Sequence, residues 1–343
     1  MPYQVTLKPS GHSYTVADGD TLLAAGIAAG CNLPYSCRAG MCRTCRGTII
    51  TGTVDYGDVE ERFLTTEQRA HGQVLLCRAR PLSDLMVEVH ELKLLGAKPK
   101  MLPCRVMGIA RPAPDVAVLS LKLPMNEPLR FAAGQYVDFI LKDGTRRSYS
   151  IANAPEVKGT STIELHIRHM PGGLFTDQLF SKMKERDVLR IEAPLGTFYM
   201  REESAKPIVF LASGTGFAPI KAIIEFMLAQ NSSRPMTLYW GCRSKQDLYM
   251  LELPQQWAAG HAGFRFIAVL SEPRPEDQWN GRTGLVHRAV MADFPDLSAH
   301  QVYACGAPVM VEAARTEFTA QCRLPEEEFF ADSFLTEADH AKG

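Results

Sequence analysis

The chain has 343 residues, of which 46% are apolar and 22% are charged, the balance of an ordinary folded protein. This length exceeds one hydrophobic core and predicts two or three domains. With 37 basic and 38 acidic side chains the formal net charge is −1, and no apolar run approaches the roughly 20 residues that span a bilayer. The composition therefore favours neither a nucleic-acid-binding protein nor a membrane protein.

The first seven residues, MPYQVTL, lack the basic region and the long apolar region of a secretory signal. We therefore expect a cytoplasmic protein. We also expect it to act as a monomer. Thiols in that compartment stay reduced, which disfavours disulfides. The nine cysteines thus point towards metal binding or catalysis, above all the three that stand close together in CRAGMCRTC, residues 37–45.

The region before residue 93 predicts a small mixed sheet with one main helix. YQVTL and HSYTVA flank the turn KPSG and indicate a hairpin. Asp20 is predicted to cap the helix TLLAAGIAAG, which Gly30 closes. Further strands are expected in GTIITG, QVLLCRA and DLMVEV, with a short helix in TTEQRAHG.

The cysteine spacing indicates a metal centre. Cys37 and Cys42 are separated by four residues, Cys42 and Cys45 by two, and Cys77 follows 32 residues after Cys45. This is the plant-type spacing of a 2Fe–2S cluster held by four thiolates. A tight loop lets three thiolates wrap two irons while backbone N–H groups offset the negative charge. Structural zinc is the alternative, although it usually takes two close pairs of Cys or His, and only one such pair exists here.

Residues 1–93 resemble plant-type ferredoxin domains, which have a β-grasp fold. The resemblance implies that the four cysteines hold the cluster and that Cys31, outside the pattern, is a packed thiol. Arg43 departs from the family, which usually has glycine at this position. An arginine there takes either an ordinary conformation or a left-handed one with about 1 kcal/mol of strain. Its charge should favour the more negative, reduced cluster.

A linker is predicted at 94–103, where Lys, Gly and Pro separate two strand-rich regions. Across residues 104–200, many short strands with turn signals predict an antiparallel barrel. RRSYSIAN places Arg147 and Tyr149 on alternate positions of one strand, with Ser150 directly after Tyr149. The cation suits a pyrophosphate, the ring suits a flat cofactor and the hydroxyl suits a ring nitrogen. An ordinary half-buried strand can also carry these residues.

Three further motifs accompany that strand, GQY at 134–136, RHMPGGLFT at 168–176 and PLGTF at 194–198. The second is a glycine turn that opens a helix, which suits phosphate binding through N–H groups. Together they resemble the FAD-binding barrel of the ferredoxin–NADP reductase superfamily. The resemblance implies that the pyrophosphate, the isoalloxazine face and the flavin N5 are contacted by Arg147, Tyr149, Ser150, Ile167, Thr176 and the amides of Gly173 and Leu174.

Past residue 206, strands alternate with helices, which predicts a parallel, doubly wound sheet. LASGTGFAPIKA, residues 211–222, is a glycine turn between a strand and a helix. It lacks the full G-x-G-x-x-G fingerprint, so a generic turn is the alternative. The segment 201–343 nevertheless resembles the nicotinamide-binding domain of the same superfamily. The resemblance implies a dinucleotide site made by Gly214, Thr215, Gly216, Arg243, Cys305 and Gly306.

The same resemblance implies a reaction centre made by Ser150, Cys305, Asp332 and Phe334. Cys305, in YACGAPVM, would stand beside the reacting nicotinamide carbon. Phe334, in FFADSF, would cover the flavin face that nicotinamide enters, and Asp332 would lie near Ser150 and Cys305. A core cysteine, a solvated acid and a packed aromatic are the alternatives.

The choice of nicotinamide cofactor depends on the segment after the second strand of this domain. An acid there favours NADH by binding the ribose 2′-hydroxyl, whereas basic residues accept the 2′-phosphate of NADPH. The chain offers both kinds, since Arg243, Ser244 and Lys245 are followed by Asp247. NADH is commoner among relatives that carry the ferredoxin domain first, so we expect NADH, with NADPH as the alternative.

The three cofactors together imply a reductase. Nicotinamide gives up two electrons as a hydride, flavin releases them singly and a cluster passes one at a time. The chain most resembles the reductase of 3,6-dideoxysugar biosynthesis, which would serve a sugar dehydrase. The reductase component of an oxygenase is the second hypothesis, and a redox-sensing iron–sulfur protein without turnover is the third. The acidic stretch DYGDVEE, residues 55–61, is either a docking site for a basic acceptor or a solvated loop.

Overall fold

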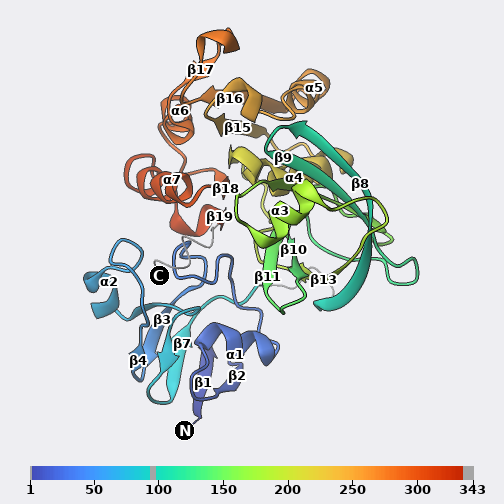
Figure 1. The fold of residues 1–343 in the computed structure, drawn as a ribbon. Helices are drawn as coiled ribbons and strands as arrows, with labels where there is room; N and C mark the ends of the chain where they lie inside the picture. Colours follow the sequence, from blue (N-terminus) through green and yellow to red (C-terminus); the bar gives the residue numbers. More distant parts are fainter. Residues whose placement is uncertain (1, 93–97, 335–343) are drawn as a thin grey trace. The chain divides into compact units, whose positions relative to one another are not determined.

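The structure is a computed structural model that describes residues 2–92 and 98–334. The chain divides into two compact units, Met1–Leu94 with Ala331–Gly343, and Leu95–Phe330. Figure 1 traces the order of the helices and strands within each unit. Among the described residues, no helix is both long and apolar enough to cross a membrane.

The first unit is built on a mixed five-stranded sheet in the order β2-β1-β7-β3-β5. Strand β1 pairs antiparallel with β2, as the predicted hairpin requires, and parallel with β7. The inward positions of β1 and β7 carry fully buried aliphatic side chains, as alternation predicts for a half-buried sheet. The elements of this unit before residue 93 are β1 (Tyr3–Lys8), β2 (Ser13–Val16), α1 (Leu22–Ala28), β3 (Arg46–Thr51), β4 (Val54–Asp55), α2 (Thr66–Ala70), β5 (Gln73–Leu75), β6 (Arg80–Pro81) and β7 (Leu85–Glu88).

The cap of helix α1 differs from the prediction. The helix begins after Thr21, whose Oγ1 accepts a hydrogen bond from the Ala24 N–H at 3.2 Å. Asp20 was the predicted cap and is wrong by one residue. An N-cap oxygen accepts from an amide two or three residues further on, and the amides of Leu22 and Leu23 already donate to the carbonyls of Ala79 and Leu76. Gly30, with a φ of +87°, follows the helix end as predicted.

The second unit opens with a six-stranded antiparallel sheet in the order β11-β10-β13-β8-β9-β12. A bridge between Ile151 and Leu165 joins the two ends of this order and closes the predicted barrel. Its interior is a cluster of buried aliphatic and aromatic side chains, including Leu119, Phe139 and Phe175. The elements are β8 (Lys100–Ala113), β9 (Val116–Lys122), β10 (Tyr136–Ile140), β11 (Arg146–Ser150), β12 (Thr162–Arg168), α3 (Leu174–Ser181) and β13 (Val188–Leu195).

The remainder of this unit contains the predicted parallel sheet, in the order β17-β16-β15-β14-β18-β19. Strands β14, β15, β16 and β18 pair parallel to one another, and β14 is an apolar run with five of six residues buried. The elements are β14 (Ile208–Ser213), η1 (Gly214–Gly216), α4 (Phe217–Ala229), β15 (Met236–Cys242), η2 (Lys245–Asp247), α5 (Glu252–Gly260), β16 (Phe264–Leu270), η3 (Pro275–Asp277), β17 (Arg282–Thr283), α6 (Val286–Asp293), β18 (Gln301–Gly306), α7 (Pro308–Gln321), η4 (Glu326–Glu328) and β19 (Phe329–Ser333). The division between the two units falls within β19, after Phe330.

Two predicted boundaries differ from the structure. Of the predicted linker 94–103, residues 94–97 lie outside the described residues, and β8 already begins at Lys100. The predicted nicotinamide domain ran to residue 343, whereas the structure groups the chain from Ala331 onward with the first unit. The physical reason lies in hydrogen bonds within that unit, since the Thr44 hydroxyl donates to the Ala331 carbonyl at 3.4 Å.

The cap of α1 gives the first testable prediction. Replacing Thr21 with alanine should lower the free energy of unfolding of the first unit by about 1 kcal/mol, because the Ala24 amide loses its acceptor. Asp20→Ala is the matched control and should change it by less than about 0.5 kcal/mol. Urea titrations of the two variants measure this difference, and a larger loss for Asp20→Ala would restore the sequence-based cap.

Candidate functional site

The four cysteines of the predicted metal centre lie together in the first unit. Cys37, Cys42 and Cys45 lie on the loop between α1 and β3, and Cys77 follows β5. Hydrogen bonds join the thiols of Cys37 and Cys42, and those of Cys45 and Cys77. The amides of Ala39 and Cys42 each donate to the Cys37 sulfur at 3.4 Å. Convergent thiols with backbone amides directed at sulfur are the donor set that a 2Fe–2S cluster requires.

The thiols perturb one another strongly. The hydrogen bond with Cys37, opposed by burial, lowers the pKa of Cys42 to about 5. The hydrogen bond with Cys42 and burial raise the pKa of Cys37, and the bond with Cys77 and burial do the same for Cys45. No three His, Cys, Asp or Glu side chains among the described residues are spaced to hold a metal ion. The fit to a cluster therefore rests on the thiol pairs and the loop amides.

Arg43 adopts the left-handed conformation, with a φ of +59°. Of the two predicted alternatives, the structure thus has the strained one, at a cost of about 1 kcal/mol. Its guanidinium Nη2 donates to the backbone carbonyl of Arg62. Arg38 and Gly40 in the same loop also have positive φ values, +55° and +80°. The loop thus folds through repeated left-handed turns, and Cys31 is a packed thiol outside it, buried at 9% exposure.

Asp332 and Phe334, predicted at the reaction centre, belong to the first unit. Asp332 is buried on β19, and its carboxylate accepts a hydrogen bond from the Ser36 hydroxyl at 2.5 Å. Ser36 directly precedes Cys37, so this acid is linked to the cysteine loop. Phe334 is half-buried just after β19. Their predicted approach to Ser150 and Cys305 stays a prediction.

The left-handed arginine gives a second prediction. Arg43→Gly should change the free energy of unfolding of the first unit by less than about 1 kcal/mol, because glycine takes a positive φ without strain but loses the hydrogen bond to the Arg62 carbonyl. It should also lower the midpoint potential of the cluster, since a cation near the sulfurs favours the reduced, more negative state. Redox titration of the variant measures the second effect. An unchanged or raised potential would remove the electrostatic role, and Arg80→Gly, on the same unit, controls for general loss of charge.

Of the predicted FAD residues on β11, Tyr149 belongs to an aromatic cluster in the barrel. The Tyr149 ring packs against Phe139 and Phe175, with centroids 5.8 and 5.3 Å apart. Burial raises the pKa of Tyr149, so its hydroxyl stays neutral. Ser150 is buried at the strand end, and Arg147 is half-buried with one nitrogen on the Arg146 carbonyl at 2.8 Å. Tyr149 and Ser150 are consecutive at the end of β11, so their side chains leave opposite faces of the strand.

Two of the accompanying motifs meet through Gln135. Its Oε1 accepts from the Ala132 amide at 2.8 Å, and its Nε2 donates to the Gly196 carbonyl at 2.9 Å. GQY is thereby joined to PLGTF. Gly196 has a φ of +89°, and a Cβ there would lie 2.6 Å from the Tyr136 ring. The structure thus brings together motifs that lie about sixty residues apart in the chain.

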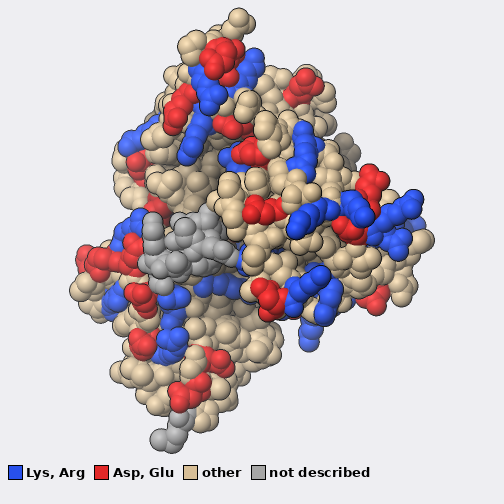
Figure 2. Space-filling view, in the orientation of Figure 1, with Lys and Arg blue, Asp and Glu red and all other residues tan. Residues whose placement is uncertain are grey.

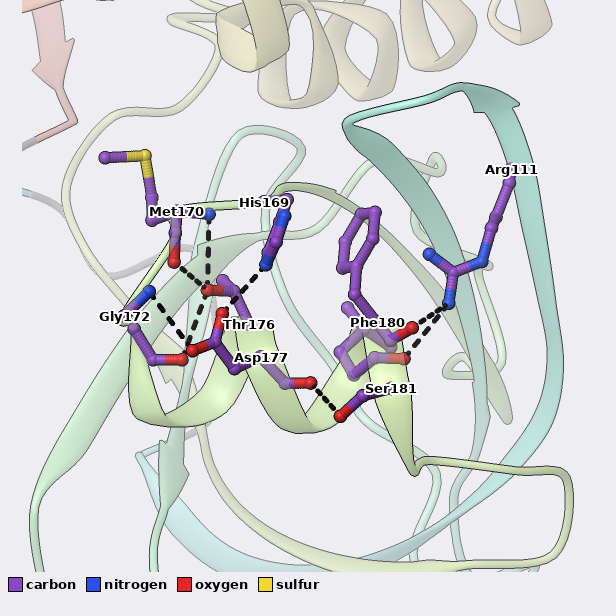
Figure 3. A network of polar contacts seen from close by, with 10 residues as sticks. Arg111, His169, Met170, Gly172, Thr176, Asp177, Phe180 and Ser181 are labelled. Carbon is purple, nitrogen blue, oxygen red and sulfur yellow. Dashed lines mark hydrogen bonds and ion pairs between the residues drawn. The ribbon is translucent and has the colours of Figure 1, made fainter.

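The predicted phosphate turn is held closed by polar side chains (Figure 3). Thr176 Oγ1 donates to the Met170 carbonyl at 2.9 Å. The Asp177 carboxylate contacts His169 Nε2 at 2.8 Å and accepts from the Gly172 amide at 3.1 Å. At the other end of α3, Arg111 donates to the carbonyls of Leu179 and Phe180. The helix is therefore fixed at both ends, with cationic Arg111 at its negative terminus.

The turn also decides which amides can meet a phosphate. The Gly173 amide donates to the Met170 carbonyl at 2.8 Å and is therefore already engaged. The next three amides, of Leu174, Phe175 and Thr176, have no described acceptor within the helix, as expected for a first turn. Ile167 is fully buried in β12, so only its backbone can face a cofactor. The FAD role of these residues stays a prediction, in which Leu174 is better placed than Gly173.

The predicted nicotinamide residues meet where β14 and β18 end. Gly214 has a φ of +51°, and Gly216 packs so closely on the Cys305 carbonyl that a Cβ there would overlap it. Gly306 packs in the same way on Ser213, whose hydroxyl accepts from the Ala307 amide at 2.9 Å. Cys305 is fully buried and Thr215 nearly so. The two glycine turns thus form one edge at the carboxyl ends of parallel strands, where dinucleotides bind in such sheets.

Arg168 is a candidate that sequence reasoning missed. Its guanidinium carbon would lie 3.5 Å from a Cβ on Gly214, and it pairs with Asp115 at 3.3 Å. Nη2 of this cation is buried without a partner among the described residues. A guanidinium over a glycine turn suits a dinucleotide phosphate. In the sequence, Arg168 is only a cation at the end of a predicted barrel strand. Nothing in the sequence shows that the glycine turn at Gly214 lies beside it.

The residues predicted to choose the nicotinamide cofactor lie after β15. Arg243 is exposed. Asp247 Oδ2 accepts from both the amide and the hydroxyl of Ser244 at 3.0 Å, and Lys245 bonds through its amide and Nζ to Asp277. Both the acid and the lysine therefore help to fold the turn. One oxygen of Asp247 and the Arg243 guanidinium have no described partner.

Gly216 supplies a third prediction. Gly216→Ala should weaken nicotinamide dinucleotide binding at least tenfold, because the added methyl must push η1 away from the Cys305 carbonyl. Cluster and FAD content should stay at the level of the unmodified protein. Gly263→Ala is the matched control, since a Cβ there meets nothing within 4 Å. Titration with NAD⁺ measures the affinity, and equal affinities in both variants would contradict the assignment.

Three protein families match consecutive segments that together make up most of the chain. A 2Fe-2S iron-sulfur cluster binding domain matches residues 5–82, an oxidoreductase FAD-binding domain matches 103–199 and an oxidoreductase NAD-binding domain matches 210–316. These matches confirm the predicted fold class and the three predicted cofactors. The zinc alternative is therefore set aside.

Full-length relatives extend the match. The chain is 40% identical over 336 residues to CDP-6-deoxy-L-threo-D-glycero-4-hexulose-3-dehydrase reductase of Yersinia pseudotuberculosis serotype I, covering 98% of this chain and 99% of the relative. It is 34% identical over 349 residues to the phenol 2-monooxygenase reductase component DmpP of Pseudomonas sp., covering 99% and 97%. A crystal structure of the Amycolatopsis cytochrome P450 reductase GcoB matches with a TM-score of 0.76 and 35% identity, covering 97% of this chain and 98% of that one.

Proposed function

Because the chain belongs to the family of NAD(P)H-dependent iron–sulfur flavoprotein reductases, we propose that it passes electrons from NADH to a sugar dehydrase. The acceptor would be a CDP-6-deoxy-L-threo-D-glycero-4-hexulose-3-dehydrase. The dehydrase would draw single electrons from the 2Fe–2S cluster. A reductase with real turnover replaces the redox-sensor hypothesis, since the chain has both cofactor domains beyond the cluster.

One observation carries the choice of acceptor. The relative named for the dehydrase is 40% identical from end to end, against 34% for the phenol 2-monooxygenase reductase component. Residues that hold FAD, nicotinamide and a cluster are shared machinery, so the motifs themselves do not name the acceptor. The reductase component of an oxygenase is therefore the second candidate, supported by the end-to-end match to DmpP.

The proposed electron path assigns a task to each part of the chain. Bound FAD would accept a hydride and release electrons one at a time. Tyr149 and Ser150 would hold the flavin ring, and the edge formed by Gly214, Thr215 and Gly216 would hold the dinucleotide phosphates. Positioning accounts for most of the catalysis, because a hydride moves only between atoms held in near contact. We propose NADH as donor because NADH is commoner among relatives that carry the ferredoxin domain first. One oxygen of Asp247 would accept from a ribose hydroxyl, whereas the Arg243 guanidinium would suit the 2′-phosphate of the alternative, NADPH.

The acidic stretch 55–61 has compensating partners within the chain. Glu60 pairs with Arg62 at 2.8 Å, and Asp55 lies 3.8 Å from Arg80. Figure 2 shows Lys and Arg side chains interspersed with Asp and Glu over the visible face. The solvated-loop alternative therefore has the better support for Asp55 and Glu60. Exposed pairs of this kind contribute at most about 1 kcal/mol and leave the acceptor surface open to either sign of charge.

Reconstitution with two acceptors tests the proposal. The chain, loaded with cluster and FAD, should support turnover of the hexulose dehydrase with NADH at least tenfold faster than turnover of the phenol 2-monooxygenase oxygenase component. Cys77→Ser should abolish that turnover while NADH still reduces ferricyanide, because the cluster loses one thiolate. Cys31→Ser, outside the cluster set, is the matched control. Support of the oxygenase alone, or of neither acceptor, would overturn the proposed partner.

A further inference from the structure

A buried polar network joins the barrel to the nicotinamide-binding part of the second unit. Lys221, on the helix that follows the glycine turn, is 8% exposed in its side chain. Its Nζ lies 3.1 Å from the Ala152 carbonyl, 3.1 Å from Glu164 Oε1 and 2.9 Å from Glu225 Oε1. An ammonium has three donors, and here all three are used. The lysine is thus held in one position by groups on two structural elements and its own helix.

The network continues through a neutral histidine. His166, with a fully buried side chain, contacts Glu164 Oε1 through Nε2 at 2.9 Å and the Tyr249 hydroxyl through Nδ1 at 2.8 Å. Burial lowers the pKa of His166. Although burial alone would raise it, the hydrogen bond from His166 and the charge of Lys221 hold the pKa of Glu164 at about 2. A carboxylate accepts only, so Nε2 carries the proton and Tyr249 donates to Nδ1.

Both ends of the network lead to the proposed reacting groups. Ala152 comes two residues after Ser150, and its amide donates to the Glu164 carbonyl at 2.7 Å. Lys221 comes five residues after Gly216, a rise of about 7 Å along a rigid helix. Phe217 stacks on Trp240 at 4.1 Å, and Trp240 donates to the Gly214 carbonyl at 3.0 Å. A shift of Lys221 would therefore displace the glycine turn Gly214–Gly216 relative to β11, the strand that carries Ser150.

We propose that Lys221, Glu164, His166 and Tyr249 form a positioning seam that sets the nicotinamide site relative to the FAD site for hydride transfer. The hydrophobic effect has no preferred direction, whereas a fully satisfied polar network fixes which groups face one another. Buried ion pairs add little net stability, so specifying geometry is the use that remains for this one. A misplacement of about 1 Å between reacting groups costs about 100-fold in rate. The inference rests on the family's reduction of FAD by nicotinamide and is independent of the acceptor.

Lys221→Met tests the seam in the full chain loaded with cluster and FAD. At saturating NADH, the rate at which NADH bleaches the flavin absorbance should fall at least tenfold, and the primary isotope effect with 4-deuterated NADH should rise. Lys221→Arg should restore most of the rate, because a guanidinium keeps the charge and the donors. Lys206→Met is the matched control, since it removes the lysine–glutamate pair with Glu328 outside the seam.

A second measurement separates positioning from folding. Without NADH, amide hydrogen exchange at Gly214–Gly216 should accelerate in Lys221→Met and not in Lys206→Met. Tyr249→Phe is the substitute test in case Lys221→Met does not fold. It removes one hydroxyl and keeps the ring packing, so it should slow flavin bleaching severalfold. Rates, isotope effects and exchange equal to those of the Lys206→Met control would overturn the seam. If NADH does not bleach the flavin of the unmodified chain, the family activity is contradicted instead. The comparison of amide hydrogen exchange between Lys221→Met and Lys206→Met still tests the seam in that case.

Discussion

The second unit depends on the close approach of two backbone segments at the edge of its parallel sheet. Gly216 lies against the carbonyl of Cys305, and Gly306 lies against Ser213, so neither glycine leaves room for a side chain. This contact brings the ends of β14 and β18 together at the place where a doubly wound sheet receives its ligand. The glycine turn, the buried Cys305 and Arg168 above Gly214 are arranged around it.

The same device, a turn in which backbone groups are left for a ligand, recurs at the other two sites. At the start of α3, Thr176 and Asp177 close the turn, and the amides of Leu174, Phe175 and Thr176 have no described acceptor within the helix. In the cysteine loop, amides of Ala39 and Cys42 point at the Cys37 sulfur. Phosphates and iron–sulfur clusters are both anionic, so backbone N–H groups can stabilise either one.

Sequence reasoning succeeded where the signal is local. The loop with Cys37, Cys42 and Cys45, the R-x-Y-S strand and the glycine turns each lie within a few residues, and the structure has the predicted loop, strand and turns there. Cys77, 32 residues after Cys45, was found through the known plant-type spacing. It failed where a contact joins distant segments or depends on one residue of register. Thr and Asp are both favourable N-cap residues, so the sequence does not choose between Asp20 and Thr21. In the structure the side chain of Thr21 accepts the capping hydrogen bond. Arg168 and the network through Lys221 were missed because their partners lie tens of residues away.

The departure of Arg43 from the ferredoxin pattern has a structural counterpart. Its left-handed conformation costs about 1 kcal/mol, which a single hydrogen bond of ordinary strength can offset. That bond runs from the guanidinium to the carbonyl of Arg62, next to the acidic stretch 55–61. A glycine would relieve the strain and lose the link. The arginine therefore links the cysteine loop to the segment that contains Arg62.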